Sequence, residues 1–261
     1  MAAISRLYRT DAIVLSRFEL GEADRVLTLL TPHFGKLKAI ARGVRRPTSR
    51  LGGSLEPFAE LHLLLARGRT FDVVTQVSIE HAWLHLRERL GPTAVAWYVA
   101  ELADRAIEER HEAVAIYGLL RRAYGLLDAG MAEGRVARWF EMRLADELGI
   151  QPELDRCVEC ERPLEPGEPL LWVPTLGGVL CARHPEPPVE RLSLSTGALK
   201  VLRAYKRADI EALAALRLPP EVEAEVESAM RMHLRHHLDR EPRSRAFLDE
   251  VGASRRRPAV G

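Results

Sequence analysis

The sequence has few cysteines, few aromatic residues and no long apolar run, and each shortage excludes a class of protein. Three cysteines in 261 residues are too few for a disulfide-rich secreted framework. The N-terminus has no apolar export segment, and no run of about 18 apolar residues occurs that would cross a membrane. These absences predict a protein of the cytoplasm.

An excess of charge of one sign is also lacking, because 38 basic and 37 acidic residues leave a formal net charge of +1. The charges are unevenly distributed, however, and residues 25–55 contain no Asp or Glu. A local excess of cations is typical of a surface that binds phosphates. We predict a DNA-binding surface made of the seven basic residues of this stretch: Arg25, Lys36, Lys38, Arg42, Arg45, Arg46 and Arg50.

Motifs of known catalytic sites are missing as well. The chain has no phosphate-binding loop of the P-loop type, no G-x-S-x-G elbow and no H-E-x-x-H helix. The sequence therefore nominates no catalytic residue and predicts a protein that is not an enzyme.

The first 80 residues have the composition of short strands. Runs rich in Val, Ile, Leu and Thr are separated by turn residues such as Gly21, Gly35 and the Gly52-Gly53 pair. Several short strands in so short a stretch predict a small closed barrel, and the OB fold is a five-stranded barrel that binds nucleic acids. The predicted strands are 12–16, 25–30, 36–44, 58–65 and 71–79.

The third predicted strand carries its charges on one face. Because side chains alternate along a strand, Lys36, Lys38 and Arg42 point one way while Leu37 and Ala39 point the other way. One face is therefore cationic, and the other can enter a core. The aromatic residues near this face are Phe34 and Phe58, so we expect base stacking to contribute little to binding.

After residue 80 the pattern changes to that of helices. Apolar residues recur at spacings of three and four over 94–109, 112–129 and 132–148, and the pattern resumes from 195 to about 238. Between these blocks lies a Pro- and Gly-rich insert that contains all three cysteines. We predict an α+β protein of three parts, an OB-fold DNA-binding domain (1–80), an all-helical domain (81–151 and 191–253) and an insert (152–190).

The cysteines of the insert have the spacing of a zinc site. Cys157-x2-Cys160 is followed by Cys181-x2-His184, so each half offers two ligands across a tight turn. Thiolates and an imidazole suit tetrahedral Zn2+, and four protein ligands leave no position open for water. The sequence thus predicts a structural zinc ion bound by Cys157, Cys160, Cys181 and His184.

Four N-terminal motifs closely resemble the start of the bacterial recombination mediator family RecO. They are GEADR at 21–25, TPHFGK at 31–36, ARGVRR at 41–46 and SRLGGSLEPF at 49–58. The cysteine module is similar to that of the zinc-bearing members, and REPRSRAFLDEV at 240–251 looks like the closing helix of the family. Those members commonly have a fourth cysteine at the position of His184.

The resemblance implies a function in DNA repair at the nucleoid. Members of this family bind single- and double-stranded DNA, anneal complementary strands and associate with RecR. They also bind the acidic tail of single-stranded DNA-binding protein and help RecA to load onto DNA coated by that protein. For an acidic tail with an apolar end, the helical part offers arginines among apolar residues; they are Arg121, Arg122, Arg138 and Arg143.

The sequence leaves two other functions open. In a scaffold protein, the zinc insert would be the platform that binds partners, and the basic loop would be incidental. A zinc-dependent hydrolase would need an open metal position and a carboxylate nearby, for which Glu159 and Glu161 are the candidates. Dependence of DNA affinity on the loop's charge argues against the first function, and metal-dependent turnover would favour the second.

Overall fold

The chain divides into two units, residues 1–130 together with 246–261 and residues 131–245. No helix within the described ranges is long and apolar enough to cross a membrane. The computed structural model gives only the backbone of residues 252–256, and it describes residues 6–47, 49, 51, 53–165, 167–185, 187, 189–238 and 242–256.

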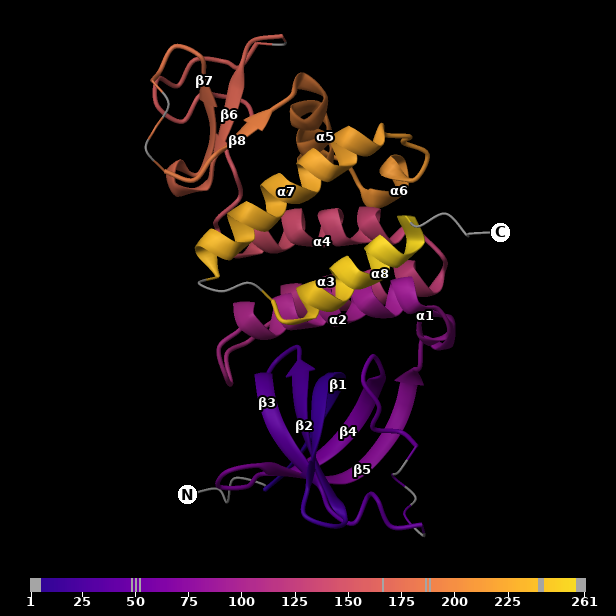
Figure 1. Ribbon diagram of the computed structural model, residues 1–261. Helices are drawn as coiled ribbons and strands as arrows, with labels where there is room; N and C mark the ends of the chain where they lie inside the picture. Colours follow the sequence, from indigo (N-terminus) through magenta and orange to yellow (C-terminus); the bar gives the residue numbers. More distant parts are fainter. Residues whose placement is uncertain are drawn as a thin grey trace, which may run out of the picture. The chain divides into compact units, whose positions relative to one another are not determined.

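The first unit begins with a closed five-stranded barrel (Figure 1). The strand order around the barrel is β1-β2-β3-β5-β4, with β3 and β5 parallel and the other neighbours antiparallel. This is the arrangement of an OB fold, as the sequence predicted. The strands are β1 (Leu7–Leu20), β2 (Asp24–Thr31), β3 (Gly35–Ala41), β4 (Glu60–Ala66) and β5 (Asp72–His81).

Side chains that alternate along the strands fill the barrel. Leu27 on β2, together with Leu37 and Ala39 on β3, belongs to its buried core. Lys36 and Lys38 lie on the opposite face of β3, where burial is lower at each alternate residue. The prediction that the third strand has one cationic face and one apolar face is therefore confirmed over residues 35–41.

The third strand ends earlier than the sequence predicted. It stops at Ala41, before residue 44, because the chain turns at Gly43, whose φ of +62° is strained for residues with a side chain. Asp24 Oδ1 accepts a hydrogen bond from the Gly43 N–H at 2.7 Å. Residues 42–47, which we call the basic loop, therefore begin in a turn held by β2.

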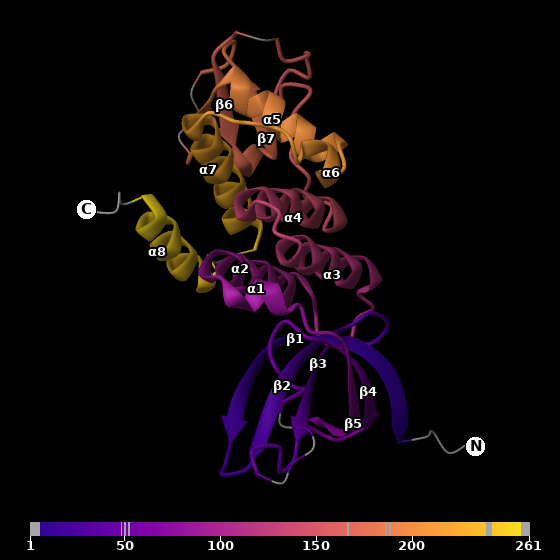
Figure 2. The same ribbon diagram turned by 90° about the vertical axis from the view of Figure 1, so that its right-hand side faces the viewer.

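Three helices follow the barrel and lie over one of its ends (Figures 1 and 2). They are α1 (Leu84–Glu88), α2 (Leu90–Ala106) and α3 (Val114–Asp128), and α2 contacts β1 while α3 contacts β2. The connection between α2 and α3 runs so close to β3 that a Cβ atom at Gly35 would lie 1.8 Å from the His111 carbonyl oxygen. Packing in the folded unit therefore requires glycine at this turn.

A buried carboxylate joins the barrel to α3. Glu60, the first residue of β4, is 5% exposed. It accepts hydrogen bonds from the Tyr117 hydroxyl at 2.7 Å and Arg121 Nε at 2.8 Å, and it lies 2.8 Å from His81 Nδ1. Burial and the bond to Glu60 raise the pKa of Tyr117, so its hydroxyl keeps the proton that it donates.

Glu60→Ala is expected to lower the free energy of unfolding of the first unit by about 2 kcal/mol, because the buried Tyr117 hydroxyl loses its acceptor. Urea denaturation followed by circular dichroism measures this change. Glu80→Ala is the matched control, because Glu80 is half-exposed and lies 2.9 Å from His62 Nε2 at the surface. It should cost less than about 1 kcal/mol. Equal stability of both variants would contradict an anchoring role for Glu60.

The second unit combines helices with a small sheet. α4 contacts α5, α6 and α7. The sheet has the order β7-β6-β8 and is antiparallel throughout. β6 and β7 lie in the predicted insert (152–190), for which the sequence indicated no strands, and β8 lies just beyond it. The elements are α4 (Glu133–Glu147), β6 (Leu170–Val173), the 3-10 helix η1 (Pro174–Leu176), β7 (Gly178–Cys181), β8 (Leu192–Leu194), α5 (Thr196–Arg207), α6 (Ile210–Leu213) and α7 (Pro220–His237), and α8 (Ser244–Arg256) follows them in the chain.

Local signals in the sequence fix where two of these helices begin. Ser195 precedes α5, and its hydroxyl oxygen accepts a hydrogen bond from the Ala198 N–H at 3.0 Å, as an N-cap residue does. Pro220 is the first residue of α7, a position that proline favours because its missing N–H has no partner there. The division into three domains, at 1–80, 81–151 with 191–253, and 152–190, stays a prediction.

Candidate metal centre and nucleic-acid interface

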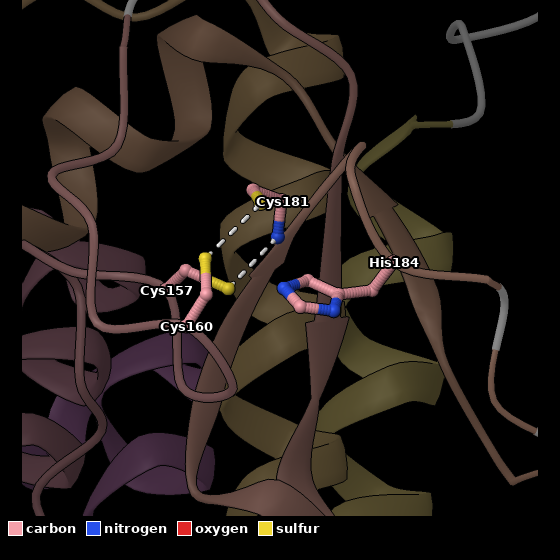
Figure 3. A group of neighbouring side chains, drawn as sticks. All are labelled: Cys157, Cys160, Cys181 and His184. Atoms are coloured by element: carbon pink, nitrogen blue, oxygen red, sulfur yellow. Dashed lines mark hydrogen bonds between the residues drawn. The ribbon is translucent and has the colours of Figure 1, made fainter.

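Two turns of the second unit bring four metal-ligating side chains together (Figure 3). Cys157 and Cys160 lie in a turn that precedes β6 in the chain, Cys181 ends β7, and His184 lies in the turn that follows β7. Their ligand atoms all lie within 4.8 Å of one another. The structure therefore places all four residues of the predicted metal site side by side.

Backbone hydrogen bonds shape both turns. The Glu161 N–H donates to the Cys157 carbonyl at 2.9 Å, and the Cys157 N–H donates to the Arg162 carbonyl at 2.8 Å. Glu161 has a φ of +58°, which closes the first turn tightly. In the second turn the His184 N–H donates to the Cys181 carbonyl at 3.3 Å. Each turn thus points two ligands to the same side.

The two turns are held in position by the chain before the first of them. The Glu153 N–H donates to the Gly177 carbonyl at 2.9 Å, and the Val179 N–H donates to the Glu153 carbonyl at 3.1 Å. A Cβ atom at Gly178 would lie 2.3 Å from that carbonyl oxygen, so the close approach requires glycine. These bonds tie both halves of the metal cluster to β7.

Hydrogen bonds to the Cys157 sulfur favour the thiolate form, which is the form that binds metals. Burial raises the pKa of Cys157, but backbone donors at Cys160, Cys181 and Glu159 outweigh it and lower that pKa to about 6. The Cys181 N–H lies 3.5 Å from Cys157 Sγ, and Arg162 Nε donates to Cys181 Sγ at 3.3 Å. Cys157 is therefore the thiol of the cluster that most readily becomes a thiolate, whereas its neighbouring thiols raise the pKa of Cys160.

The donor set fits a tetrahedral metal ion. Cys160 Sγ and Cys181 Sγ are 3.9 Å apart, close to the edge of about 3.8 Å that metal–sulfur bonds of ~2.3 Å give in a tetrahedron. His184 Nε2 is buried and has no hydrogen-bond partner in the part of the chain that the structure describes. The cluster could therefore hold a metal ion with four protein ligands.

The predicted DNA-binding residues of the first unit fall into two groups, and the first group has acidic partners. Arg25 and Lys36 are also largely buried, with side chains 11% and 17% exposed. The Lys36 ammonium donates to the Asp104 carbonyl at 2.5 Å, in addition to its ion pair. The ion pairs are Arg25 with Glu56 at 3.3 Å, Lys36 with Asp104 at 3.3 Å, Lys38 with Glu109 at 3.4 Å and Arg45 with Glu19 at 3.0 Å.

The second group consists of Arg42 and Arg46. Both are exposed in the basic loop, and neither forms an ion pair with another residue of the described ranges. The Arg45 N–H donates to the Ala23 carbonyl at 3.0 Å, which holds the loop beside the β1–β2 hairpin. Arg50 lies outside the described residues. Arg42 and Arg46 can therefore bind phosphates without first breaking an ion pair to a described residue.

Of the aromatic residues that the sequence placed near this surface, Phe58 is buried and Phe34 is partly buried. Phe34 packs against Tyr8 with ring centroids 4.6 Å apart, and Phe58 is buried against Trp97 at 4.8 Å. Phe18 is instead the exposed aromatic residue of β1, at 50%. The predicted first strand stopped at residue 16, whereas β1 runs to Leu20 with a register shift between Val14 and Ser16, so Phe18 lay outside the predicted strand.

Most of the arginines predicted to bind an acidic tail form hydrogen bonds or ion pairs with other groups of the protein. Arg121 is bound to Glu60 in the first unit. In the second unit Arg138 is buried and pairs with Glu141, and Arg143 donates to the Ala208 carbonyl at 3.0 Å. The sequence could not show this, because the acceptors are brought in by folding.

Comparison with known proteins finds relatives over nearly the whole chain. The family described as recombination protein O N terminal matches residues 4–83, and the family described as recombination protein O C terminal matches residues 87–246. The DNA repair protein RecO of Roseiflexus sp. (strain RS-1) is 41% identical, over 94% of this chain and 86% of that protein. The DNA repair protein RecO of Desulforudis audaxviator (strain MP104C) is 39% identical, over 95% of this chain and 98% of that protein.

Proposed function

The chain belongs to the RecO family of DNA repair proteins, and from that premise we propose that it acts as a recombination mediator. It binds single- and double-stranded DNA and anneals complementary strands. With RecR it helps RecA to load onto DNA coated by single-stranded DNA-binding protein, at the nucleoid in the cytoplasm. The observation that carries this proposal is a pair of exposed arginines on a loop of an OB-fold barrel, Arg42 and Arg46, which form no ion pair with a described residue.

The proposed mechanism requires binding and no catalytic step. Cations of the basic loop neutralise phosphates on two strands at once, which lowers the repulsion between the strands and raises their local concentration. Because phosphates are the same at every nucleotide, this part of the affinity depends little on base sequence. Pairing of the bases then drives annealing.

The metal ion of the second unit is proposed to be structural Zn2+. Three thiolates and one imidazole are ligands that zinc prefers, and four protein ligands leave no position for a reactive water. The ion holds the turn at Cys157 and Cys160 against the turn at Cys181 and His184. This assignment disfavours a hydrolase, because Glu159 and Glu161 would have no metal-bound water to activate.

The acidic tail of single-stranded DNA-binding protein is proposed to bind in the second unit. An acidic peptide with an apolar end requires a cation beside apolar side chains. Among the arginines that the sequence nominated, Arg143 is partly exposed and offers such a cation, whereas Arg138 is buried and paired with Glu141.

Annealing of two complementary oligonucleotides, followed by fluorescence quenching, tests the proposal. The full chain is expected to accelerate annealing of bare strands and of strands coated with single-stranded DNA-binding protein. A scaffold protein would leave both rates unchanged. Strand hydrolysis by the metal-loaded protein, lost on metal removal from the folded chain, would overturn the mediator assignment in favour of an enzyme.

A further inference from the structure

Across the outer face of the barrel, the strand register sets an apolar row. Phe18 on β1 pairs with Val26 on β2, Val26 pairs with Ile40 on β3, and Ile40 pairs with Val73 on β5. Leu27 and Ala39, the neighbours of Val26 and Ile40, belong to the interior of the barrel, so the row faces away from it.

The row is exposed at its β1 end. Phe18 is 50% exposed and Leu20, two residues further on the same face, is 40% exposed, whereas Val26 is fully buried. A half-exposed phenylalanine beside a half-exposed leucine forms an apolar patch on a strand end that is otherwise polar. These two side chains give the face a small flat apolar surface.

Cations border this patch. Lys38, two residues before Ile40 on the same face of β3, is paired with Glu109, whereas Arg42, two residues after Ile40 at the start of the basic loop, forms no ion pair with a described residue. The Arg45 guanidinium donates to the Gly21 carbonyl at 3.3 Å, which fixes the loop beside the tip of the hairpin that carries Phe18. A ligand that fits this face therefore carries anionic groups next to a flat apolar surface of its own.

We propose that Phe18 is a stacking platform for an unpaired base of single-stranded nucleic acid, whose phosphates lie on Arg42 and the basic loop. This inference rests on the proposed function and adds that the site distinguishes single strands from duplexes. A base in a duplex is already stacked and paired, so its face is not available to Phe18. Phosphates are common to both forms, so the arginines bind both and Phe18 favours single strands.

A comparison of normal and abasic strands tests this inference with the full chain. The probes are a labelled oligothymidine, an abasic strand of the same length and a duplex of the same length. The wild-type protein is expected to bind oligothymidine about fivefold to tenfold more tightly than the abasic strand, as one aromatic stacking contact provides. In Phe18→Ala this preference should fall to about one, while affinities for the abasic strand and the duplex stay unchanged.

Three variants serve as controls. Phe18→Tyr keeps an aromatic ring and should keep the preference, and Phe18→Leu keeps apolar bulk without the ring and should lose it. Ile79→Ala removes another exposed apolar side chain, further along β5 than the pairing of Val73 with Ile40, and should behave as the wild type. A preference that survives in Phe18→Ala, or an equal loss for all three probes, would overturn the inference. A wild-type protein that binds none of the probes would instead overturn the proposed function.

Discussion

Replacing Cys157 with serine is expected to remove the metal ion and to loosen residues 152–190 while the barrel stays folded. A structural zinc site supplies roughly 10–16 kcal/mol of apparent binding free energy, which in a small module is also its folding free energy. The module contains only two strands, β6 and β7, of four residues each, and so has little apolar interior of its own. The barrel has a separate core in the first unit, so its stability should not change when the metal ion is lost.

Elemental analysis and limited proteolysis measure this result. The wild type should contain one zinc ion per chain, and Cys157→Ser should contain none and be cleaved within 152–190. Glu159→Gln is the matched control, because this exposed carboxylate lies in the same turn and is not among the four ligands. It should keep its zinc. Metal retained at full occupancy in Cys157→Ser would refute the ligand assignment, and loss of cooperative unfolding of the barrel would refute its independence from the module.

The double variant Arg42→Gln/Arg46→Gln is expected to bind single-stranded DNA about sixtyfold more weakly than the wild type at 50 mM salt, and about tenfold more weakly at 200 mM. Each lost phosphate contact removes about 0.7 from the slope of log affinity against log salt for single strands, so the slope should shrink by about 1.4. For a duplex the same arithmetic gives about 1.8. Annealing should slow in parallel, because the proposed mechanism gives these residues no other role.

A control for net charge comes from Arg9→Gln/Arg69→Gln, which removes the same charge at two exposed positions of the barrel outside the basic loop. This variant should keep most of the slope. Lys36→Gln should also change the slope little, because Lys36 is already bound to Asp104. A slope in the double variant equal to that of the wild type would place the DNA site elsewhere on the molecule.

Features that depend on neighbouring residues could be predicted from the sequence. The spacing of Cys157, Cys160, Cys181 and His184 predicted that they cluster, because a tight turn brings side chains three residues apart to the same side whatever the rest of the chain does. The two faces of β3 followed from alternation, and the beginning of α5 followed from the helical spacing of apolar residues that resumes at 195. In each case the backbone geometry of a few residues decides the outcome.

Features that depend on distant residues were decided only by the tertiary structure. Seven cations look alike in a stretch without acids, yet Arg25 and Lys36 are occupied by Glu56 and Asp104, which other segments of the chain supply. Likewise, Glu60 is buried because α3 brings Tyr117 and Arg121 to it. The sequence determined which residue types were present and how neighbours were oriented. Folding decided which charges were neutralised and which stayed exposed, because an ion pair needs a partner within a few ångströms in space, at any separation along the chain.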